Sequence, residues 1–192
     1  MMISNNLFSL ESKTALVTGG STGLGLMATA GLAAAGAKVF IVSRKLENCE
    51  KAANKINNCN FKGQVVPFKG DLSSEAGISN IVNELHKKNS ELHVLVNNAG
   101  RTWGSNFGSF PYDAWEKVLN LNVSALFHLT QKLVPLLAAS AERDSPTRVI
   151  NIGSVMGEVP MGDGAYSYAA SKSAVHHITK ILAKELAEKN IT

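Results

Sequence analysis

The chain has 192 residues, which is enough for one domain with a substantial hydrophobic core. Its content of 45% hydrophobic and 18% charged residues is ordinary for a globular protein and excludes a disordered or fibrous chain. The formal net charge of +4 comes from scattered Lys and Arg residues, so we expect no nucleic-acid partner. We predict a single domain over residues 1–192.

The sequence has no recognisable secretion signal, membrane span or metal-ligand spacing. Residues 1–10 lack the basic region and apolar run of a secretion signal, and no stretch is apolar for long enough to cross a bilayer. Cys49 and Cys59 have no metal-ligand or redox spacing, and the five histidines have no metal-binding spacing. We therefore predict a soluble, cytoplasmic protein with no membrane span and no metal site.

Short β-branched segments alternate with longer helical patterns along the chain. A helix over residues 24–35 is ended by Gly36, a long amphipathic helix spans residues 112–139, and a last helix spans residues 168–189. The alternation predicts an α/β domain with a doubly wound parallel sheet of the Rossmann type and strand order 3-2-1-4-5. The predicted strands are residues 14–18, 38–42, 64–68, 93–96 and 148–152.

A glycine-rich turn, Thr18-Gly-Gly-Ser-Thr-Gly-Leu-Gly25, joins the first strand to the first helix. Glycines let the backbone turn sharply and approach a pyrophosphate, and the free N–H groups of the helix start stabilise its charge. A tight turn that binds nothing is the alternative. The strand before it and the helix after it favour a dinucleotide site.

The end of the second strand distinguishes the two nicotinamide cofactors. An acid at this place binds the ribose 2′-OH of NAD(H), but here the sequence is Ser43-Arg44-Lys45. Arg44 offers a planar fork for a 2′-phosphate, which favours NADP(H). A solvated loop charge is the alternative for Arg44.

Two further segments follow strands at the same edge of the sheet. Asp71, in Gly70-Asp-Leu-Ser73, could accept a hydrogen bond from an adenine amino group, or could cap the helix that follows it. Asn97-Asn-Ala-Gly100 follows the fourth strand, and its small and amide residues allow close approach of a cofactor.

Tyr168 and Lys172 are four residues apart on a predicted helix and so share one face. An ammonium beside the phenol would favour its ionised form and make Tyr168 a proton donor to a carbonyl oxygen. Tyr166 has Ala170 at that spacing and is the weaker candidate. A chance pair of Tyr and Lys is the alternative.

Two polar residues complete the candidate catalytic group. Ser154 follows the fifth strand and could hydrogen-bond the reacting oxygen, or could serve only the turn. A hydrolase elbow needs glycines two residues before and after the serine, where Ile152 and Met156 stand. Asn122 lies within the long helix, where its amide could hold a water or be only a tolerated polar residue.

Taken in order, these motifs resemble the short-chain dehydrogenase/reductase family over nearly the whole chain. The resemblance implies an NADP(H)-dependent oxidoreductase in which Tyr168 is the acid/base, Ser154 orients the substrate, Lys172 binds the nicotinamide ribose and Asn122 orders a proton relay. It also implies cofactor contacts from Gly19, Ser21, Thr22, Gly23, Leu24, Gly25, Arg44, Asp71, Leu72, Asn98, Ala99, Gly100, Ile152, Tyr168 and Lys172.

Within the family, the segments DLSSEAG, WEKV and RVINIGSV are most similar to the rhamnolipid-type 3-oxoacyl-[acyl-carrier-protein] reductases. The substrate implied is a 3-oxoacyl thioester, free or bound to a carrier protein. Apolar residues Trp103, Met156, Val159 and Met161 would suit its alkyl chain, or could simply pack the core beneath the loops. Basic residues Lys132, Arg143 and Arg148 would attract an acidic carrier.

Alternatives remain at the level of the substrate and of activity itself. A sugar, steroid or other alcohol dehydrogenase would share the same catalytic residues, and a non-catalytic nucleotide-binding fragment would share the same cofactor motifs. Family members normally continue through another strand, a substrate-covering segment and a last strand. We therefore expect a longer protein or a fragment truncated at the carboxyl end, forming a homodimer or homotetramer when full length.

Overall fold

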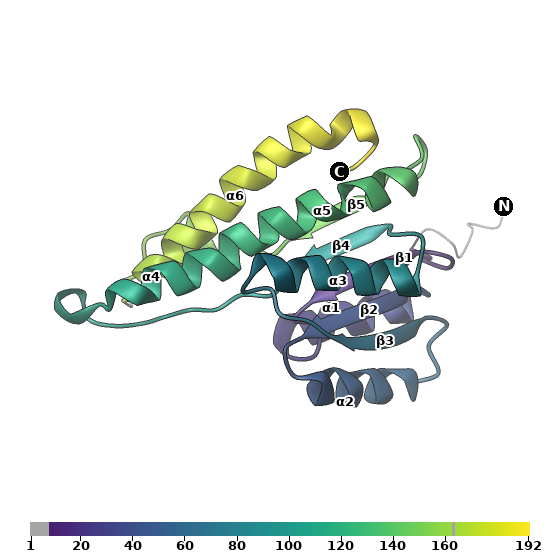
Figure 1. Ribbon diagram of the computed structural model, residues 1–192, viewed down its shortest axis with the longest axis horizontal. Coiled ribbons are helices and arrows are strands. Elements are labelled where there is room, and N and C mark those ends of the chain that lie inside the picture. The colour runs from purple at the N-terminus through teal and green to yellow at the C-terminus, as the bar shows by residue number, and fades with distance from the viewer. Residues whose placement is uncertain (1–7, 163) are drawn as a thin grey trace.

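A computed structural model describes residues 8–162 and 164–192 as a five-stranded parallel sheet with order β3-β2-β1-β4-β5, as predicted (Figure 1). The predicted absence of a secretion signal concerns Met1–Leu7 in large part, and these lie outside the described residues. The strands are β1 (Thr14–Thr18), β2 (Lys38–Ser43), β3 (Gln64–Lys69), β4 (Val94–Asn97) and β5 (Arg148–Asn151).

Helices cover both faces of the sheet and enclose two hydrophobic cores. Residues from α1 (Gly23–Ala34) and α2 (Leu46–Asn57) pack against one face, as alternate side chains of a strand point to opposite faces. The other face is covered by α3 (Glu75–Lys88), α5 (Ala125–Ala139) and α6 (Tyr166–Leu186). Two covered faces explain why β1 is buried along its whole length.

The predicted helix over residues 112–139 is confirmed in its bounds, but a π-helical turn interrupts its α-helical pattern. It consists of α4 (Tyr112–Leu119), a π-helical turn at Asn120–Ser124, and α5. A π turn holds one more residue than an α turn and often marks a functional site. Pro135 lies inside α5 without ending it. Periodicity alone does not reveal such a turn, because both helix types give a similar apolar pattern over a few residues.

The last helix and the end of the chain also differ slightly from expectation. Helix α6 begins at Tyr166, two residues earlier than predicted, and a 3-10 turn over Ala187–Lys189 follows it. Ile191 then forms a parallel bridge with Thr147, and the Val149 N–H donates to the Thr192 carbonyl oxygen at 2.8 Å. The final residues thus lie beside β5 in strand-like pairing.

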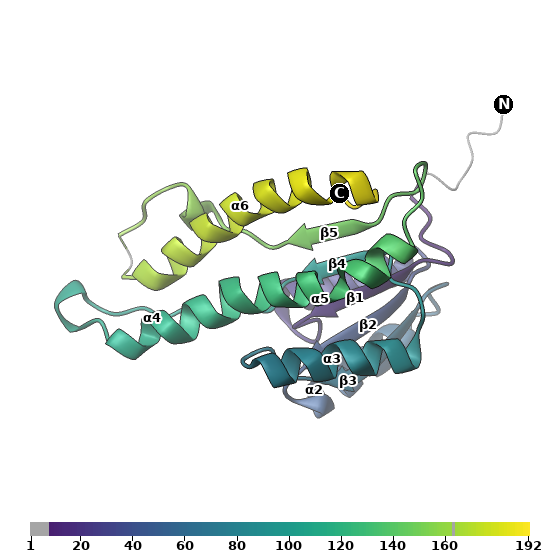
Figure 2. The same cartoon turned by 45° about the horizontal axis from the view of Figure 1, so that its top comes forward.

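Helix α4 and the first part of α6 project together beyond the carboxyl edge of the sheet (Figures 1 and 2). Residues of α4 and α6 contact each other there. No described helix is long and apolar enough to span a membrane.

Candidate active site

Thr18 and Asn98 join the carboxyl ends of β1 and β4, where the connections from these two strands leave in opposite directions. The Thr18 hydroxyl accepts hydrogen bonds from the Asn98 and Ala99 N–H groups, each at 3.0 Å. The Asn98 amide in turn donates to the Thr18 carbonyl oxygen at 2.9 Å. Ligands of open α/β sheets bind at such a point, so these bonds fix the two loops that would hold a ligand.

The glycines of the predicted dinucleotide turn are required by the fold at this place. Gly19 and Gly23 have φ values of +64° and +53°, which only glycine adopts readily. A Cβ on Gly25 would lie 2.3 Å from the Gly19 carbonyl oxygen and 2.4 Å from the Asn98 amide nitrogen. The start of α1 therefore packs directly on the turn, with its backbone close to the neighbouring loop.

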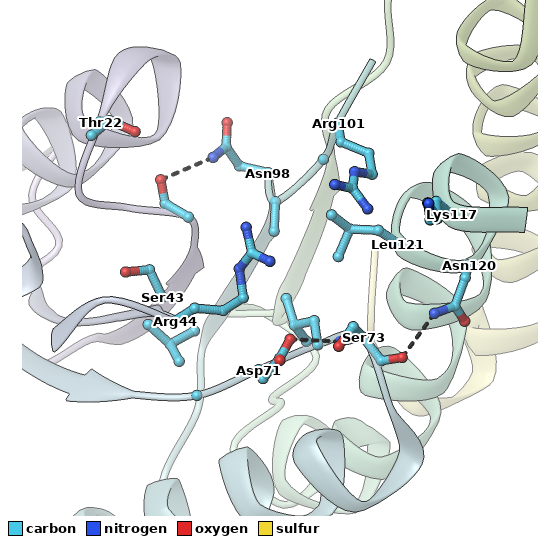
Figure 3. Close-up of a pocket in the computed structure, with 16 residues that line it drawn as sticks. Thr22, Ser43, Arg44, Asp71, Ser73, Asn98, Arg101, Lys117, Asn120 and Leu121 are labelled. Carbon is cyan, nitrogen blue, oxygen red and sulfur yellow. Dashed lines mark hydrogen bonds between the residues drawn. The ribbon is translucent and has the colours of Figure 1, made fainter. Parts of the chain in front are cut away.

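A cavity of about 320 Å³ opens beside this turn (Figure 3). Eight of the predicted cofactor residues line it: Gly19, Thr22, Arg44, Asp71, Leu72, Asn98, Ala99 and Gly100. The lining residues that the sequence reasoning did not assign to the cofactor are Val42, Ser43, Gly70, Ser73, Arg101, Lys117, Asn120 and Leu121.

Three cationic side chains, Arg44, Arg101 and Lys117, line the cavity together with one carboxylate, that of Asp71. Figure 3 shows the Arg44 side chain extending into it from the end of β2, with Arg101 on the other side. Within the described part of the chain, neither guanidinium forms an ion pair, whereas Lys117 is paired with Asp113. Two unpaired guanidinium groups make the cavity suited to phosphate. Arg101 directly follows the Asn-Asn-Ala-Gly segment, so its position in the sequence could have indicated that it lines the cavity.

Asp71 lines the cavity and does not cap the helix after it. Its carboxylate accepts from the Ser73 N–H at 2.9 Å, while Ser74 is the N-cap of α3 and accepts from the Gly77 N–H at 3.1 Å. The helix-cap alternative for Asp71 is therefore wrong. Asn120 donates to the Ser73 carbonyl oxygen at 2.8 Å and ties this loop to the π turn.

Tyr168 and Lys172 lie on one face of α6, as their spacing predicted. The Lys172 ammonium is 5.6 Å from the centre of the Tyr168 ring and donates to the Ile152 carbonyl oxygen at 2.6 Å. Only 7% of Lys172 is exposed, and this burial lowers the pKa of its ammonium. Tyr166 instead packs edge-on against Phe107 and Phe110, with ring centres 5.9 and 5.5 Å away.

Ser154 begins the short 3-10 turn Val155–Gly157 that follows β5. Its hydroxyl oxygen accepts from the Met156 N–H at 3.3 Å, which leaves the hydroxyl hydrogen free to donate to a ligand. Its own N–H donates to the Nε2 atom of His176 at 3.3 Å. The serine is therefore held through both its backbone and its side chain.

Asn122 is buried in the π turn, and its amide is strongly engaged. Its nitrogen donates to the Arg101 carbonyl oxygen and to the Ser171 hydroxyl, both at 2.9 Å, and its oxygen accepts from the Arg101 N–H at 2.8 Å. Because both amide hydrogens are used, only the oxygen has capacity left for a water. Asn122 thus joins the loop after β4 to α6.

A second, apolar groove of about 610 Å³ lies between α4 and the start of α6. Tyr166 and Ala169, which flank Tyr168 on α6, form part of its wall. Of the apolar residues named from the sequence, only Met161 lines it. The other lining residues are Phe107, Phe110, Trp115, Pro160 and Ala165.

Several predicted cofactor residues do not line the first cavity. Ser21, Gly23, Leu24 and Gly25 belong to the same glycine turn, but Leu24 is 66% exposed and Gly25 is buried by packing. Ile152, Tyr168 and Lys172 lie beyond it, on the loop after β5 and on α6. Residues 8–162 and 164–192 contain no group of three His, Cys, Asp or Glu side chains that could hold a metal ion.

The family model described as short chain dehydrogenase matches residues 13–192. The chain belongs to this family. A short-chain dehydrogenase is an oxidoreductase, so the parallel sheet, the glycine turn and the Tyr168–Lys172 pair belong to an enzyme of that class.

Two related proteins and one solved structure match nearly the whole chain. A rhamnolipids biosynthesis 3-oxoacyl-[acyl-carrier-protein] reductase of Pseudomonas aeruginosa is 46% identical to this short-chain dehydrogenase over 96% of the chain, which spans 71% of that protein. A solved Pseudomonas aeruginosa RhlG/NADP active-site complex superposes with a TM-score of 0.92 at 46% identity, covering 98% of this chain and 73% of that one. A 5-keto-D-gluconate 5-reductase of Escherichia coli is 34% identical, with 97% and 71% covered.

Proposed function

We propose that this short-chain dehydrogenase uses NADPH to reduce the 3-oxo group of acyl thioesters to a 3-hydroxy group. The main support is the combination of a cationic cavity, a free serine hydroxyl and a Tyr–Lys pair around the carboxyl ends of β1, β4 and β5. The similarity to a reductase of 3-oxoacyl-[acyl-carrier-protein] supports the choice of substrate.

The residues of the first cavity fit a phosphorylated dinucleotide. Thr22, the N-cap of α1, makes no side-chain hydrogen bond to the start of the helix, so backbone N–H groups there remain for a pyrophosphate. Arg44 has no acidic partner among the described residues, so its guanidinium group is available to bind a 2′-phosphate. The solved relative named above is an NADP complex. When bound, the nicotinamide supplies the hydride that reduces the carbonyl carbon.

The chain's own groups would handle the carbonyl oxygen and its proton. Ser154 donates a hydrogen bond to that oxygen with the hydroxyl hydrogen that its contact with Met156 leaves free. Tyr168 gives the phenolic proton to the same oxygen, and the nearby Lys172 ammonium stabilises the charge that the phenol acquires. Asn122 holds the loop after β4 against α6 through Arg101 and Ser171.

The apolar groove gives the substrate assignment a structural basis. Its aromatic and methionine side chains would hold an alkyl chain better than a polyhydroxylated sugar.

The basic residues Arg143 and Arg148 do not support carrier binding near the site. Arg148 begins β5 and Arg143 precedes that strand, so both lie toward the amino edge of the sheet. The Lys132 ammonium lies 3.8 Å from a carboxylate oxygen of Glu75, on the side of the sheet that α3 and α5 cover.

A ketosugar reductase is the second candidate, because a relative named for that activity is 34% identical. Steady-state reduction of 3-oxoacyl thioesters of several chain lengths, beside sugar and steroid ketones, separates the two. We expect kcat/KM to rise with acyl length. Faster turnover of a sugar or steroid ketone would remove the lipid assignment, and NADPH binding without any turnover would favour a non-catalytic nucleotide-binding fragment.

Three further predictions concern the domain organisation, the assembly and the cellular location of the protein. The single domain over residues 1–192, the homodimer or homotetramer, and the cytoplasmic location stay predictions. The set of catalytic and cofactor residues given above is likewise part of this proposal, and the variants described in the Discussion test its main members.

A further inference from the structure

One stripe of α6 binds the last residue of β5 and the loop after it at three points. Thr179 accepts from the Asn151 amide at 2.9 Å, and Lys172 donates to the Ile152 carbonyl oxygen at 2.6 Å. The third contact is made by His176, whose Nε2 accepts from the Ser154 N–H at 3.3 Å. Because His176 lies four residues after Lys172, it shares the face that carries Tyr168 and Lys172.

The His176 ring is packed directly against the backbone on both sides of Ser154. A Cβ on Gly153 would lie 2.3 Å from its Nε2 atom, and a Cβ on Gly157 would lie 2.8 Å from its Cε1 atom. These distances are too short for any side chain. The two glycines thus allow the ring to reach the loop, and the ring fills the space beneath it.

The hydrogen bond also defines the tautomer of His176. Since Nε2 accepts a hydrogen from Ser154, it carries none in the neutral ring, and the hydrogen is on Nδ1. Nδ1 is buried and has no hydrogen bond among the described residues, but it lies 3.4 Å from an oxygen of the Glu158 carboxylate. Glu158 therefore favours the tautomer that leaves Nε2 free to accept.

We propose that His176 is a positioning residue, which holds the backbone of Ser154 so that its hydroxyl faces the reacting carbonyl oxygen. This inference rests on the proposed reductase function. His176 touches neither Tyr168 nor Lys172 in the contacts above and acts only through Ser154. A shift of Ser154 by a fraction of an ångström would weaken its contact with the carbonyl oxygen in the transition state.

Substitution of His176 tests the contact, and the chain provides a matched control in His177, which is exposed on the same helix. We expect His176→Leu, which lacks the acceptor, to lower kcat about tenfold to a hundredfold while KM for NADPH stays within about twofold. His176→Gln, which can place an oxygen near the position of Nε2, should restore most of kcat. His177→Leu should behave as the unmodified protein.

A double variant separates positioning from a general loss of structure. In a Ser154→Ala background the hydroxyl is gone, so adding His176→Leu should lower kcat little further. Losses that multiply in the double variant, or no recovery in His176→Gln, would overturn the proposal.

Hydrogen exchange of the Ser154 amide gives a readout that needs no turnover. We expect exchange at least about tenfold faster in His176→Leu than in the unmodified protein, with protection kept in His176→Gln and His177→Leu. Unchanged exchange in His176→Leu would overturn the inference even if the reductase function holds. Absence of thioester reduction by the unmodified protein, with the exchange pattern as expected, would count against the proposed function alone.

Discussion

The Lys172 ammonium donates to the Ile152 carbonyl oxygen and, among the described residues, has no carboxylate partner. A buried cation stabilised by one backbone dipole is costly and is rarely kept without a task. We expect Lys172→Met to lower NADPH-dependent turnover by about a hundredfold or more, since Tyr168 loses the neighbouring charge. Lys180→Met, exposed on the same helix, is the control. Similar small losses in both variants would remove Lys172 from the proposed mechanism.

Arg44 is expected to select NADPH over NADH. Loss of a charge-assisted contact to the 2′-phosphate costs about 1.5 to 3 kcal/mol, so Arg44→Ala should weaken NADPH binding by roughly tenfold to more than a hundredfold and leave NADH unchanged. Fluorescence titration with both cofactors measures this. The adjacent Lys45, which is exposed and does not line the cavity, provides the control variant Lys45→Ala. Equal kcat/KM for the two cofactors in the unmodified protein would contradict the assignment.

The two tyrosines at the start of α6 should differ sharply in their effect. Tyr168→Phe removes the proposed proton donor but keeps the ring, so turnover should fall about a hundredfold or more while NADPH still binds. Tyr166→Phe removes a hydroxyl from a ring that packs on Phe107 and Phe110, and should change mainly KM for the acyl substrate. A larger loss of kcat in Tyr166→Phe would reverse the two roles.

Gly25 tests the close packing of α1 on the glycine turn. In Gly25→Ala the new methyl group would overlap the Gly19 carbonyl and the Asn98 amide, so both the melting temperature and NADPH affinity should fall. Gly31 lies in the same helix with open space around it, so Gly31→Ala should stabilise the protein by roughly 0.5–1 kcal/mol. Thermal unfolding of both variants, with and without NADPH, provides the comparison, and equal behaviour of the two would exclude a special role for Gly25.

His93 gives the stability of the fold a dependence on pH. Its Nδ1 atom accepts from the Thr14 N–H at 3.1 Å, and burial, with the nearby charge of Lys13, lowers the pKa of its ring below 6.5. The unfolded chain therefore binds a proton at higher pH than the folded chain does. Stability should be fully present above pH 6.5 and decline as the pH falls through the lower, folded value.

The variant His93→Asn keeps an acceptor near the position of Nδ1 but does not titrate. We expect the melting temperature of the unmodified protein to fall relative to that of His93→Asn between about pH 7 and pH 5. If the melting temperatures of the two proteins changed with pH in parallel over this range, protonation of His93 would not contribute to the pH dependence of stability.

The sheet and its order were predictable because β1 and β2 are short apolar segments rich in β-branched residues and each strand is followed by a helix-length segment. The glycine turn and Arg44 were predictable for a related reason: their places at the ends of strands fix where they lie. The site residues that directly follow a strand could therefore be placed from the local sequence.

The other half depends on contacts between distant segments. The apolar groove combines Phe107 and Trp115 with Met161 and Tyr166, and no spacing in the sequence brings these together. Asn122 read as a tolerated polar residue or a water ligand because its partners, Arg101 and Ser171, are 21 and 49 residues away. His176 could not be linked to Ser154 for the same reason, since the two residues are 22 positions apart, on a helix and a loop.

The π turn at Asn120–Ser124 has a consequence for engineering of this enzyme. An α-helix advances about 100° per residue, and a π turn contains one residue more, so α5 presents a different face than an uninterrupted continuation of α4 would. This change of phase lets α4 face α6 while α5 faces α3. Deleting a single residue from the turn would rotate one half of the helix against the other, so library designs should keep the length of this segment fixed, and Asn120 and Asn122 within it, even where they vary its other residues.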